Sequence, residues 1–363
     1  MNKPKICVYA ISLNELKHVD RFMNGCKTAD LVVVCDTGST DGTAHRLREL
    51  GATVHVAQIK PWRFDVARNH ALSIVPHDMD ICLTVDLDEV LQPGWRDGID
   101  EAWNRNPNLN RLRYNYVWNW KADDTPDTQF TADRWHDRHN YVWKHPCHET
   151  VYWCGSGVEQ VEDTISVLHH HADNTKPRSS YLPLLKLAVE EDPQNDRMAH
   201  YYARELYFYA KYDEAITEFD RHLKINPHSW NEERASTYGY MSKAYRALNN
   251  HQQSIVCAVR GVLECEYTRE PWLELARASY IKQDWQTCYW ASTKCLEIKQ
   301  RTASYIADNS AWGHEPYDYA ALSSHFLGLK DKALEYGKTA AELCPTDPRL
   351  QSNLELYKAS LNN

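Results

Sequence analysis

The feature that most constrains the fold is a regular alternation of short apolar runs with helical stretches in the first half of the chain. The run Leu31–Cys35 is continuous and rich in β-branched residues, which is typical of a strand buried on both faces. Glu15–Cys26 instead has apolar residues at helical spacing. Strands that alternate with helices form right-handed crossovers, so we predict an α/β domain with a mostly parallel, Rossmann-like sheet and helices on both faces. The expected strands are 5–10, 31–35, 53–57 and 81–85, and the expected helices are 15–26, 42–50 and 65–75.

The second half of the chain has a different rhythm. From about Tyr181 onward helical patterns dominate, separated by short polar turns. Four turns look alike, and each ends on a small residue that can open a second, closely packed helix. These small residues, at positions 215, 254, 288 and 333, are 39, 34 and 45 residues apart. Such intervals are typical of a helical solenoid, and an irregular helical bundle is the alternative. This half resembles tetratricopeptide-like repeats, and we predict two domains, residues 1–178 and 179–363.

Composition excludes several classes of protein. The 363 residues suffice for two domains with sizeable cores. Lys and Arg number 41 and Asp and Glu 50, a net charge of −9 that disfavours a general nucleic-acid binder. The longest early apolar run, Ile6–Ile11, is too short for a signal peptide or a membrane span. The 11 cysteines include no CxxC pair, so we expect reduced thiols in a cytoplasmic protein. A secreted disulfide scaffold, an integral membrane protein and a disordered chain are disfavoured.

Polar and acidic residues follow three of the predicted strands at the point where each strand ends. Asn14 and Glu15 follow the first strand, the stretch 36–43 follows the second, and Asp86, Asp88 and Glu89 follow the fourth. Ligands of open α/β sheets bind beyond the carboxyl ends of the strands, so we expect these side chains along one edge. The alternative for 36–43 is a plain turn with a helix cap.

The acidic triplet after the fourth strand points to a cation. Carboxylates this close repel one another unless a cation or protons neutralise them. A hard divalent cation prefers oxygen ligands and keeps positions for water and phosphate, so Asp-x-Asp suits a bridge between a metal and a diphosphate. The alternative is that Asp88 or Glu89 caps the next segment. The chain contains neither GxGxxG nor GxxxxGK[ST], which argues against dinucleotide-binding Rossmann domains and P-loop nucleotidases.

Four segments, in this order and spacing, together resemble an inverting family 2 glycosyltransferase with a GT-A-type fold. They are Ile11–Glu15 (ISLNE), Leu31–Thr43 (LVVVCDTGSTDGT), Ala67–Ala71 (ARNHA) and Leu83–Val90 (LTVDLDEV). The resemblance covers residues 5–95 well and 96–172 loosely. Catalytic domains of this type are familiar in combination with tetratricopeptide-like helices, which the second half supplies.

The resemblance implies a metal-dependent transfer of a sugar from a nucleotide-diphosphate sugar, a UDP-sugar, to an acceptor hydroxyl with inversion. Arg68 would approach the diphosphate or the base, Asp86 would touch ribose or sugar, and Asp88 would hold Mn²⁺ or Mg²⁺ at the catalytic centre. A cation and an arginine are suited to the negative charge of the leaving diphosphate. The other donor-site residues are Ala10, Ile11, Glu15, Asp36, Thr37 and Gly38.

Inversion in one displacement requires a carboxylate on the acceptor side to take the hydroxyl proton. The segment 143–151 (WKHPCHETV) contains a His-Glu element that resembles one seen in repeat-bearing members of the family. Glu149 is the candidate base, Asp133 and Asp137 are its rivals, and a surface salt bridge is the alternative for Glu149. The acceptor-side candidates are His148, Trp143 and Asp137.

A run of three histidines, residues 169–171, offers a further candidate ligand for the metal. The resemblance suggests that His169 or His171, after the predicted strand 164–168, completes the metal shell opposite Asp88. A partly exposed histidine run is the alternative, and a zinc site is less favoured because no cysteine pair accompanies the histidines.

Two other functions fit the same sequence. A glycosyltransferase-like half without activity would leave a scaffold or binding protein that acts through its repeats, and a nucleotidyl transferase would release pyrophosphate. The acceptor stays open between a protein, a glycan, a lipid head group and a modified nucleobase. A nucleobase in duplex DNA would require base extrusion and a basic groove, for which Arg111, Arg113, Arg134 and Arg138 are candidates. The repeats would orient the acceptor, bind a protein partner or mediate a homodimer.

Overall fold

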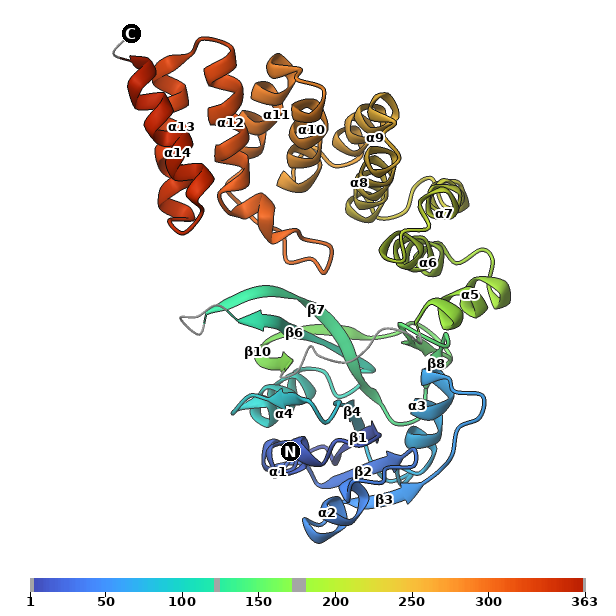
Figure 1. The fold of residues 1–363 in the computed structure, drawn as a ribbon. Coiled ribbons are helices and arrows are strands. Elements are labelled where there is room, and N and C mark those ends of the chain that lie inside the picture. The colour runs from blue at the N-terminus through green and yellow to red at the C-terminus, as the bar shows by residue number, and fades with distance from the viewer. Residues whose placement is uncertain (1–2, 121–124, 172–180, 362–363) are drawn as a thin grey trace. The chain divides into compact units, whose positions relative to one another are not determined.

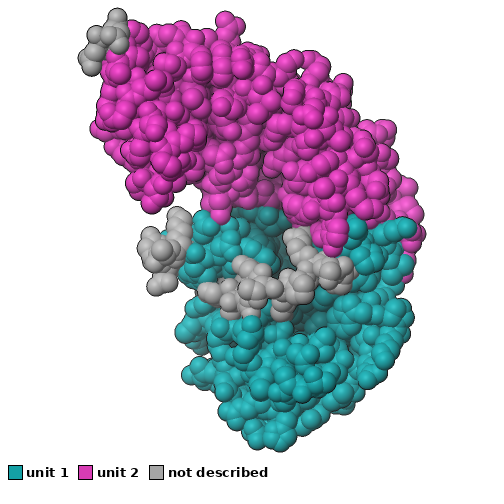
Figure 2. Space-filling view, viewed as in Figure 1, with its two compact units in different colours: residues 1–188, 303–305 teal, residues 189–302, 306–363 magenta. Residues whose placement is uncertain are grey.

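The computed structural model describes residues 3–120, 125–171 and 181–361, and for residues 164–171 it describes the backbone alone. The chain forms two compact units (Figure 2). The first consists of Met1–Ala188 with Ala303–Tyr305, and the second of Val189–Thr302 with Ile306–Asn363. The boundary expected between residues 178 and 179 lies outside the described residues.

The first unit is built on an eight-stranded sheet with the order β3-β2-β1-β4-β7-β6-β10-β5 (Figure 1). The four strands from β3 to β4 are parallel, and β6 is parallel to β10. The long strand β7 is antiparallel to both its neighbours, and β5 is antiparallel to β10. This confirms the predicted mostly parallel α/β sheet. The strands are β1 Ile6–Ser12, β2 Leu31–Asp36, β3 Thr53–Val56, β4 Ile81–Thr84, β5 Glu89–Leu91, β6 Arg111–Trp120, β7 Pro126–Asp137 and β10 Val161–His171.

Helices and a small hairpin cover the two faces of this sheet. The helices are α1 Leu16–Gly25, α2 Thr43–Glu49, α3 Phe64–Ser73 and α4 Trp95–Arg105, and the hairpin pairs β8 Tyr141–Lys144 with β9 Thr150–Trp153. Helix α5 Tyr181–Glu191 begins in the first unit and ends in the second. The expected helices and strands of residues 5–85 all occur, with ends that differ by a few residues at most. The hairpin and α4 were not predicted.

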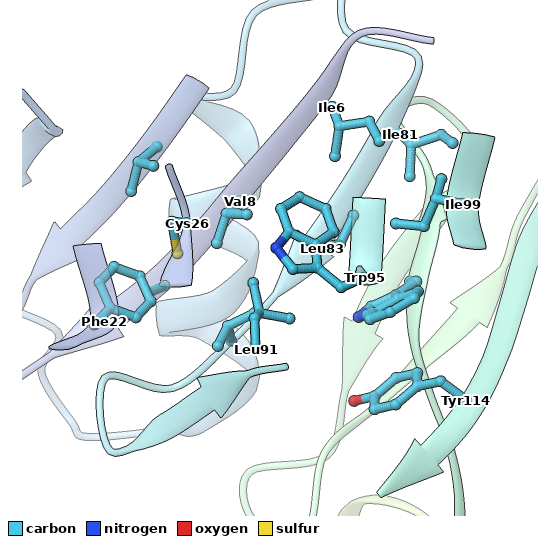
Figure 3. Close-up of a cluster of buried hydrophobic side chains, with 14 of the residues drawn as sticks. Ile6, Val8, Phe22, Cys26, Ile81, Leu83, Leu91, Trp95, Ile99 and Tyr114 are labelled. Carbon is cyan, nitrogen blue, oxygen red and sulfur yellow. The ribbon is translucent and has the colours of Figure 1, made fainter. Parts of the chain in front are cut away.

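Strand β1 explains why both faces are covered. Its residues 6–11 are apolar without interruption and are almost all fully buried, and successive side chains point to opposite faces. Ile6 and Val8 pack on one side with Phe22 of α1 and Ile99 of α4 (Figure 3). On the other side, Cys7 and Tyr9 pack with α3 and with the β8–β9 hairpin. The hairpin therefore occupies part of the face that α3 leaves open.

The second unit consists of helices arranged in pairs. The predicted small residues are all buried, and each lies near the start of the second helix of a pair: Ala215 in α7, Ser254 in α9, Cys288 in α11 and Ala333 in α13. This confirms the predicted helical-repeat domain. The helices are α6 Asp196–Phe208, α7 Tyr212–Ile225, α8 Asn231–Ala247, α9 His251–Glu264, α10 Arg269–Ile281, α11 Trp285–Glu297, α12 Glu315–Phe326, α13 Lys330–Leu343 and α14 Pro348–Leu361, with a 3₁₀ turn at Asn309–Trp312.

The helices of the second unit approach closely where small residues allow it. A Cβ atom added to Gly337 of α13 would lie 2.5 Å from the ring of Tyr357 in α14, so only glycine admits this packing. Pro227 and Pro345 follow the ends of α7 and α13, where a proline prevents the helix from continuing. All 11 cysteines are free thiols. In the described part of the chain, no helix has the length and apolar character needed to cross a membrane.

A buried chain of hydrogen bonds links the β8–β9 hairpin to the sheet. The indole N–H of Trp143 donates to the hydroxyl of Tyr9 at 2.8 Å, and this hydroxyl lies 2.8 Å from Nε2 of His136. Nδ1 of His136 lies 2.7 Å from the carbonyl oxygen of Asp137 and donates to it. Nε2 is then the acceptor for Tyr9, which fixes the neutral tautomer. Burial lowers the pKa of His136 to about 4.

We expect His136 to make stability depend on pH. Because the folded pKa lies below the ordinary value of 6.5, the unfolded chain takes up the proton first as the pH falls. The stabilisation is complete above pH 6.5 and is lost between pH 6.5 and 4, with a total on the order of 3 kcal/mol. Urea unfolding of the wild type and of His136→Gln across this range measures the effect. The variant should show a shallower loss of stability, and equal slopes would contradict the assignment.

Candidate active site

The carboxyl edge of the parallel strands begins with a closed turn around Asp36. One oxygen of this buried carboxylate accepts the backbone N–H groups of Gly38 and Ser39 at 3.1 and 2.8 Å. The other accepts the hydroxyls of Ser12 at 2.9 Å and of Ser39 at 2.6 Å. Gly38 has a φ of 116°, which favours glycine. The carboxylate thus has four donors from the protein itself, so a ligand N–H or O–H would compete with them.

A second set of hydrogen bonds joins the loop after β1 to the loop after β2. Asn14 Oδ1 accepts from the backbone N–H of Thr40 at 2.8 Å, and the hydroxyl of Thr43 accepts from the N–H of Glu15 at 2.9 Å. Asp41 accepts from the N–H of Leu16 at 3.1 Å. The stretch 36–43 is therefore both a turn and a brace for the first loop, which fits the plain-turn alternative as well as a ligand site.

The predicted donor-site residues of these loops lie at the same edge, with different exposure. Ala10 is fully buried in the core, so its side chain has no free surface. Ile11 and Thr37 are half-buried, and Thr37 donates its hydroxyl to the carbonyl of Ser12 at 2.9 Å. Glu15 is buried, with one oxygen 3.8 Å from Nε2 of His18.

The acidic triplet follows β4 at this edge, and its members differ. Glu89 is buried and structural: Oε1 accepts from Tyr116 at 2.6 Å and from Arg134 at 3.0 Å, and Oε2 accepts from the N–H of Asp86 at 2.9 Å. Asp88 is 2% exposed, and its carbonyl oxygen accepts from Arg21 of α1 at 3.3 Å. Glu89 is the first residue of strand β5, so it opens the next segment, as the alternative interpretation held, although that segment is a strand and not a helix.

Arg68 of α3 connects the segments of the site. Its Nε donates to Glu149 Oε1 at 2.5 Å, and its Nη2 lies 3.0 Å from Asp86 Oδ1. Nη1 donates to the hydroxyl of Thr84 at 3.1 Å, and the guanidinium stands 5.1 Å from the ring centre of Trp143. Burial opposes the charge of Arg68, but Asp86 and Glu149 outweigh it, so the pKa of Arg68 lies above its ordinary value.

The β8–β9 hairpin places Glu149 beside this arginine. Asn69, next to Arg68 in α3, accepts from the N–H of Trp143 at 2.9 Å and donates to its carbonyl at 2.8 Å. Glu149 immediately precedes β9, so this pair of hydrogen bonds holds the hairpin on α3. The structure thereby joins residues 68, 86 and 149, which are far apart in the sequence, through direct contacts.

The acceptor-side candidates separate into two places. Trp143 is 3% exposed and hydrogen-bonded in the core, so it offers little surface to an acceptor. His148 lies next to Glu149, with its ring 5.5 Å from that of Tyr181. Asp137 pairs in register with Ile81, at the start of β4. That position is five residues before Asp86, or about 16 Å along the strand, so Asp137 lies at the opposite edge of the sheet.

Asp133 and the four arginines named for a basic groove each have their own protein partners and do not line one common surface in these contacts. Asp133 accepts from Arg111 at 2.9 Å, Arg113 pairs with Asp163 at 2.6 Å, and Arg138 donates to the carbonyl of Val75 at 2.7 Å. Arg134 alone of these arginines contacts the acidic triplet. The groove suggested from the sequence thus has no support in these contacts.

The histidine ligands can be placed only by their backbone. In the antiparallel pair of β10 and β5, His169 is opposite Leu91 and His171 is opposite Glu89. The strand expected at 164–168 is part of β10. The side chains of His169 and His171 lie outside the described residues. Among the side chains that are described, no cluster of three or more His, Cys, Asp or Glu has metal-binding geometry.

Sequence reasoning named Arg134 only for a basic groove, and it missed that Arg134 and Tyr116 organise the acidic triplet. Arg134 of β7 bridges Asp86 at 3.4 Å and Glu89 at 3.0 Å, and it stands 5.7 Å from the ring centre of Tyr116. Asp86 and Glu89 raise the pKa of Arg134 despite burial. The antiparallel pairing of β7 with β4 creates these contacts, and no local motif announces that pairing.

The fold is a mostly parallel α/β sheet followed by paired helices, which is the architecture that the sequence resemblance implied. No family model matches the chain. A curated protein of Rickettsia prowazekii (strain Madrid E), the uncharacterized glycosyltransferase RP128, is 37% identical over 98 residues. The match covers 26% of this chain and 32% of that protein, so this chain spans about a third of the length of its relative.

Solved structures are similar to each half. YrrB, a tetratricopeptide-repeat protein with an unusual peptide-binding site, has 13% identity and a TM-score of 0.41 over 49% of this chain and 84% of its own. MamA has 17% identity and a TM-score of 0.38 over 45% and 86%. Glucosyl-3-phosphoglycerate synthase from Mycobacterium tuberculosis, solved with Mn²⁺ and uridine diphosphate, has 21% identity and a TM-score of 0.27 over 31% and 44%. At these TM-scores the similarities carry no argument about function.

We expect Arg68→Met to destabilise the first unit strongly. The substitution leaves Glu149 without its cationic partner in a largely buried setting and leaves Asp86 with only its longer contact to Arg134, and breaking a buried pair of this kind costs about 3–5 kcal/mol. The matched control is Arg113→Met, which removes an arginine from an exposed pair with Asp163 and should cost less than about 1 kcal/mol. Denaturant unfolding compares the two variants. Equal, small losses would show that Arg68 is not central to the edge.

Proposed function

We propose that the first unit is a glycosyltransferase that moves a sugar from a nucleoside-diphosphate sugar, with UDP-sugar as the favoured donor, to an acceptor hydroxyl with inversion. The observation that carries this proposal is the contact of Arg68 with both Asp86 and Glu149. It brings the Asp-x-Asp segment and a second carboxylate, from a distant hairpin, to one edge of the sheet. The curated relative supports the same class of reaction.

Glu149 is the proposed base. The acceptor oxygen would attack the anomeric carbon, its proton would pass to the Glu149 carboxylate, and the bond to the diphosphate oxygen would break with its electron pair leaving on the diphosphate. Arg68 fixes the position of Glu149 through a 2.5 Å contact. The rivals are less suitable, because Asp137 lies at the opposite edge and Asp133 is paired with Arg111.

Arg134 rather than Arg68 is proposed to contact the diphosphate. The side chain of Arg68 is 4% exposed and its three nitrogens are engaged. The side chain of Arg134 is 30% exposed, and its ion pairs with Asp86 and Glu89 use Nη1 alone. An arginine with free N–H groups beside an Asp-x-Asp segment can stabilise the charge that develops on a leaving phosphate.

Asp88 is the proposed metal ligand, with His169 or His171 completing the shell. The backbone of His171 is opposite Glu89 across β5 and β10, one residue from Asp88, so the histidine segment runs beside the acidic triplet. Carboxylate oxygens with one imidazole suit Mn²⁺ or Mg²⁺. When bound, the cation would offset the charge of the diphosphate.

The second unit is proposed to orient the acceptor, to bind a protein partner or to form a homodimer. Helical repeats present long surfaces suited to such roles. The acceptor itself is left open between a protein, a glycan, a lipid head group and a modified nucleobase.

We expect Glu149→Gln to lower kcat by about 10²- to 10⁴-fold, because the acceptor proton then has no base. Affinity for the nucleotide should change little. Steady-state kinetics with a UDP-sugar, together with a thermal melt of each variant, measure this. The control is Asp133→Asn, which makes the same change of charge at the rival carboxylate and should keep wild-type turnover. Normal turnover of a folded Glu149→Gln protein would exclude Glu149 as the base.

We expect turnover of the donor to depend on Mn²⁺ or Mg²⁺ and to stop when the cation is chelated. Release of UDP from a UDP-sugar, followed with and without chelator, checks this. Asp88→Asn should weaken binding of the metal, measured by calorimetry.

Unchanged metal affinity in a His169→Ala/His171→Ala variant would remove both histidines from the shell. Release of pyrophosphate would indicate nucleotidyl transfer, and a protein that binds no nucleotide and turns over no nucleotide sugar would be a scaffold.

A further inference from the structure

A pocket lies at the amino edge of the sheet, opposite the candidate active site. Its volume is about 520 Å³, within the range of small-molecule sites. The pocket is formed where β4, β6 and β10 begin, where β7 and β9 end, and at the end of α4. None of the residues of the proposed catalytic centre lines it. This edge therefore has a concave site of its own.

The lining combines aromatic surface with side-chain amides. Trp103 and Trp153 supply two half-buried indoles, and the stacked imidazoles of His77 and His139, with ring centres 5.9 Å apart, lie at the exposed part of the lining. Gly155 sets the position of one indole, because an added Cβ would lie 2.4 Å from the ring of Trp153. Planar rings of this kind pack against the C–H faces of sugar rings.

Hydrogen-bonding groups of the lining are left for a ligand. The indole nitrogen of Trp153 is buried and has no hydrogen-bond partner among the described residues, which is a costly state for a buried donor. The side-chain amide of Asn108 makes no hydrogen bond with any described residue, and that of Gln160 makes one long contact of 3.4 Å with its neighbour Val158. Amides that both donate and accept suit the hydroxyls of a saccharide.

Charge argues against ionic ligands. Asp78, Asp80 and Asp137 line the pocket, and carboxylates repel phosphates. They are also poorly suited to bind a cation, since each is already engaged. Lys5 holds Asp78 through its ammonium and Asp80 through its backbone N–H, each at 2.7 Å. Asp137 accepts from the backbone of His139 and Asn140, each at 2.9 Å. A neutral, hydroxyl-rich ligand fits this combination best.

We propose that the pocket between Trp103, Trp153, Asn108 and Gln160 is a saccharide-binding site, separate from the catalytic edge and suited to a neutral mono- or disaccharide unit. Sugar faces pack against the indoles, and sugar hydroxyls pair with the Trp153 N–H and the two amides. The proposal does not depend on the proposed transfer reaction, because binding at this edge requires neither donor nor metal.

Calorimetric titration of the full chain with maltose, cellobiose, lactose and N,N′-diacetylchitobiose tests the site. We expect saturable binding of at least one disaccharide with a millimolar Kd. Trp153→Phe deletes the unpartnered N–H but keeps the ring, and it should weaken binding about tenfold, equivalent to 1.4 kcal/mol. Asn108→Ala with Gln160→Ala, two exposed positions where substitution carries little risk to the fold, should weaken binding by at least the same factor.

Two controls separate this site from the rest of the protein. Trp290→Phe makes the same change at a 49% exposed indole of the second unit and should leave affinity unchanged. Trp153→Phe should leave the affinity for UDP unchanged, which distinguishes the pocket from the catalytic edge. Three results would overturn the proposal. None of the four disaccharides binds, the pocket variants bind as well as the wild type, or the protein prefers choline, spermidine or UDP and the pocket variants abolish that preference.

Discussion

The ion pairs of Arg68 are the interaction on which the carboxyl edge depends. Four protein groups contact this one guanidinium: Thr84 at the end of β4, Asp86 just after β4, Glu149 before β9, and the ring of Trp143 in β8. A guanidinium can satisfy several partners at once because its five N–H groups point in fixed, divergent directions. Without it, the largely buried Glu149 would lose its cationic partner. The hairpin that carries Glu149 is thus fixed electrostatically as well as by packing.

The two edges of the sheet have different chemistry because of strand direction. Carboxyl ends of the parallel strands gather loops with acidic residues, an arrangement suited to a cation and a phosphate. Amino ends of β4, β6 and β10 gather amides and indoles, which suit neutral ligands. Strand β7 runs antiparallel between them and contributes to both, with Arg134 at one edge and Asp137 at the other. Strand β7 therefore supplies a positive charge, Arg134, to one site and a negative charge, Asp137, to the other.

Much of this arrangement could be predicted from the sequence, and the parts that could not be predicted were missed for physical reasons. The continuous apolar run of β2 and the helical spacing of α1 specify their own structure, so Asp36 and Asp86 could be placed at strand ends. The small residues at 215 and 333 likewise report helix packing directly. Arg134 and the β8–β9 hairpin could not be placed, because antiparallel pairing between distant segments leaves no local pattern. The closure of the turn around Asp36 and the burial of Arg68 were also missed, since both depend on which neighbours the fold supplies.

The hydrogen-bond chain Trp143–Tyr9–His136 has a polarity that a proton can reverse. With neutral His136, the protons run from the indole through the phenol toward the imidazole. An imidazolium donates at both nitrogens, so the Tyr9 oxygen would receive two N–H groups, and its own hydroxyl proton would have to turn away from His136. Acid would thus reverse the direction of the hydrogen bond that joins Tyr9 of β1 to His136 of β7.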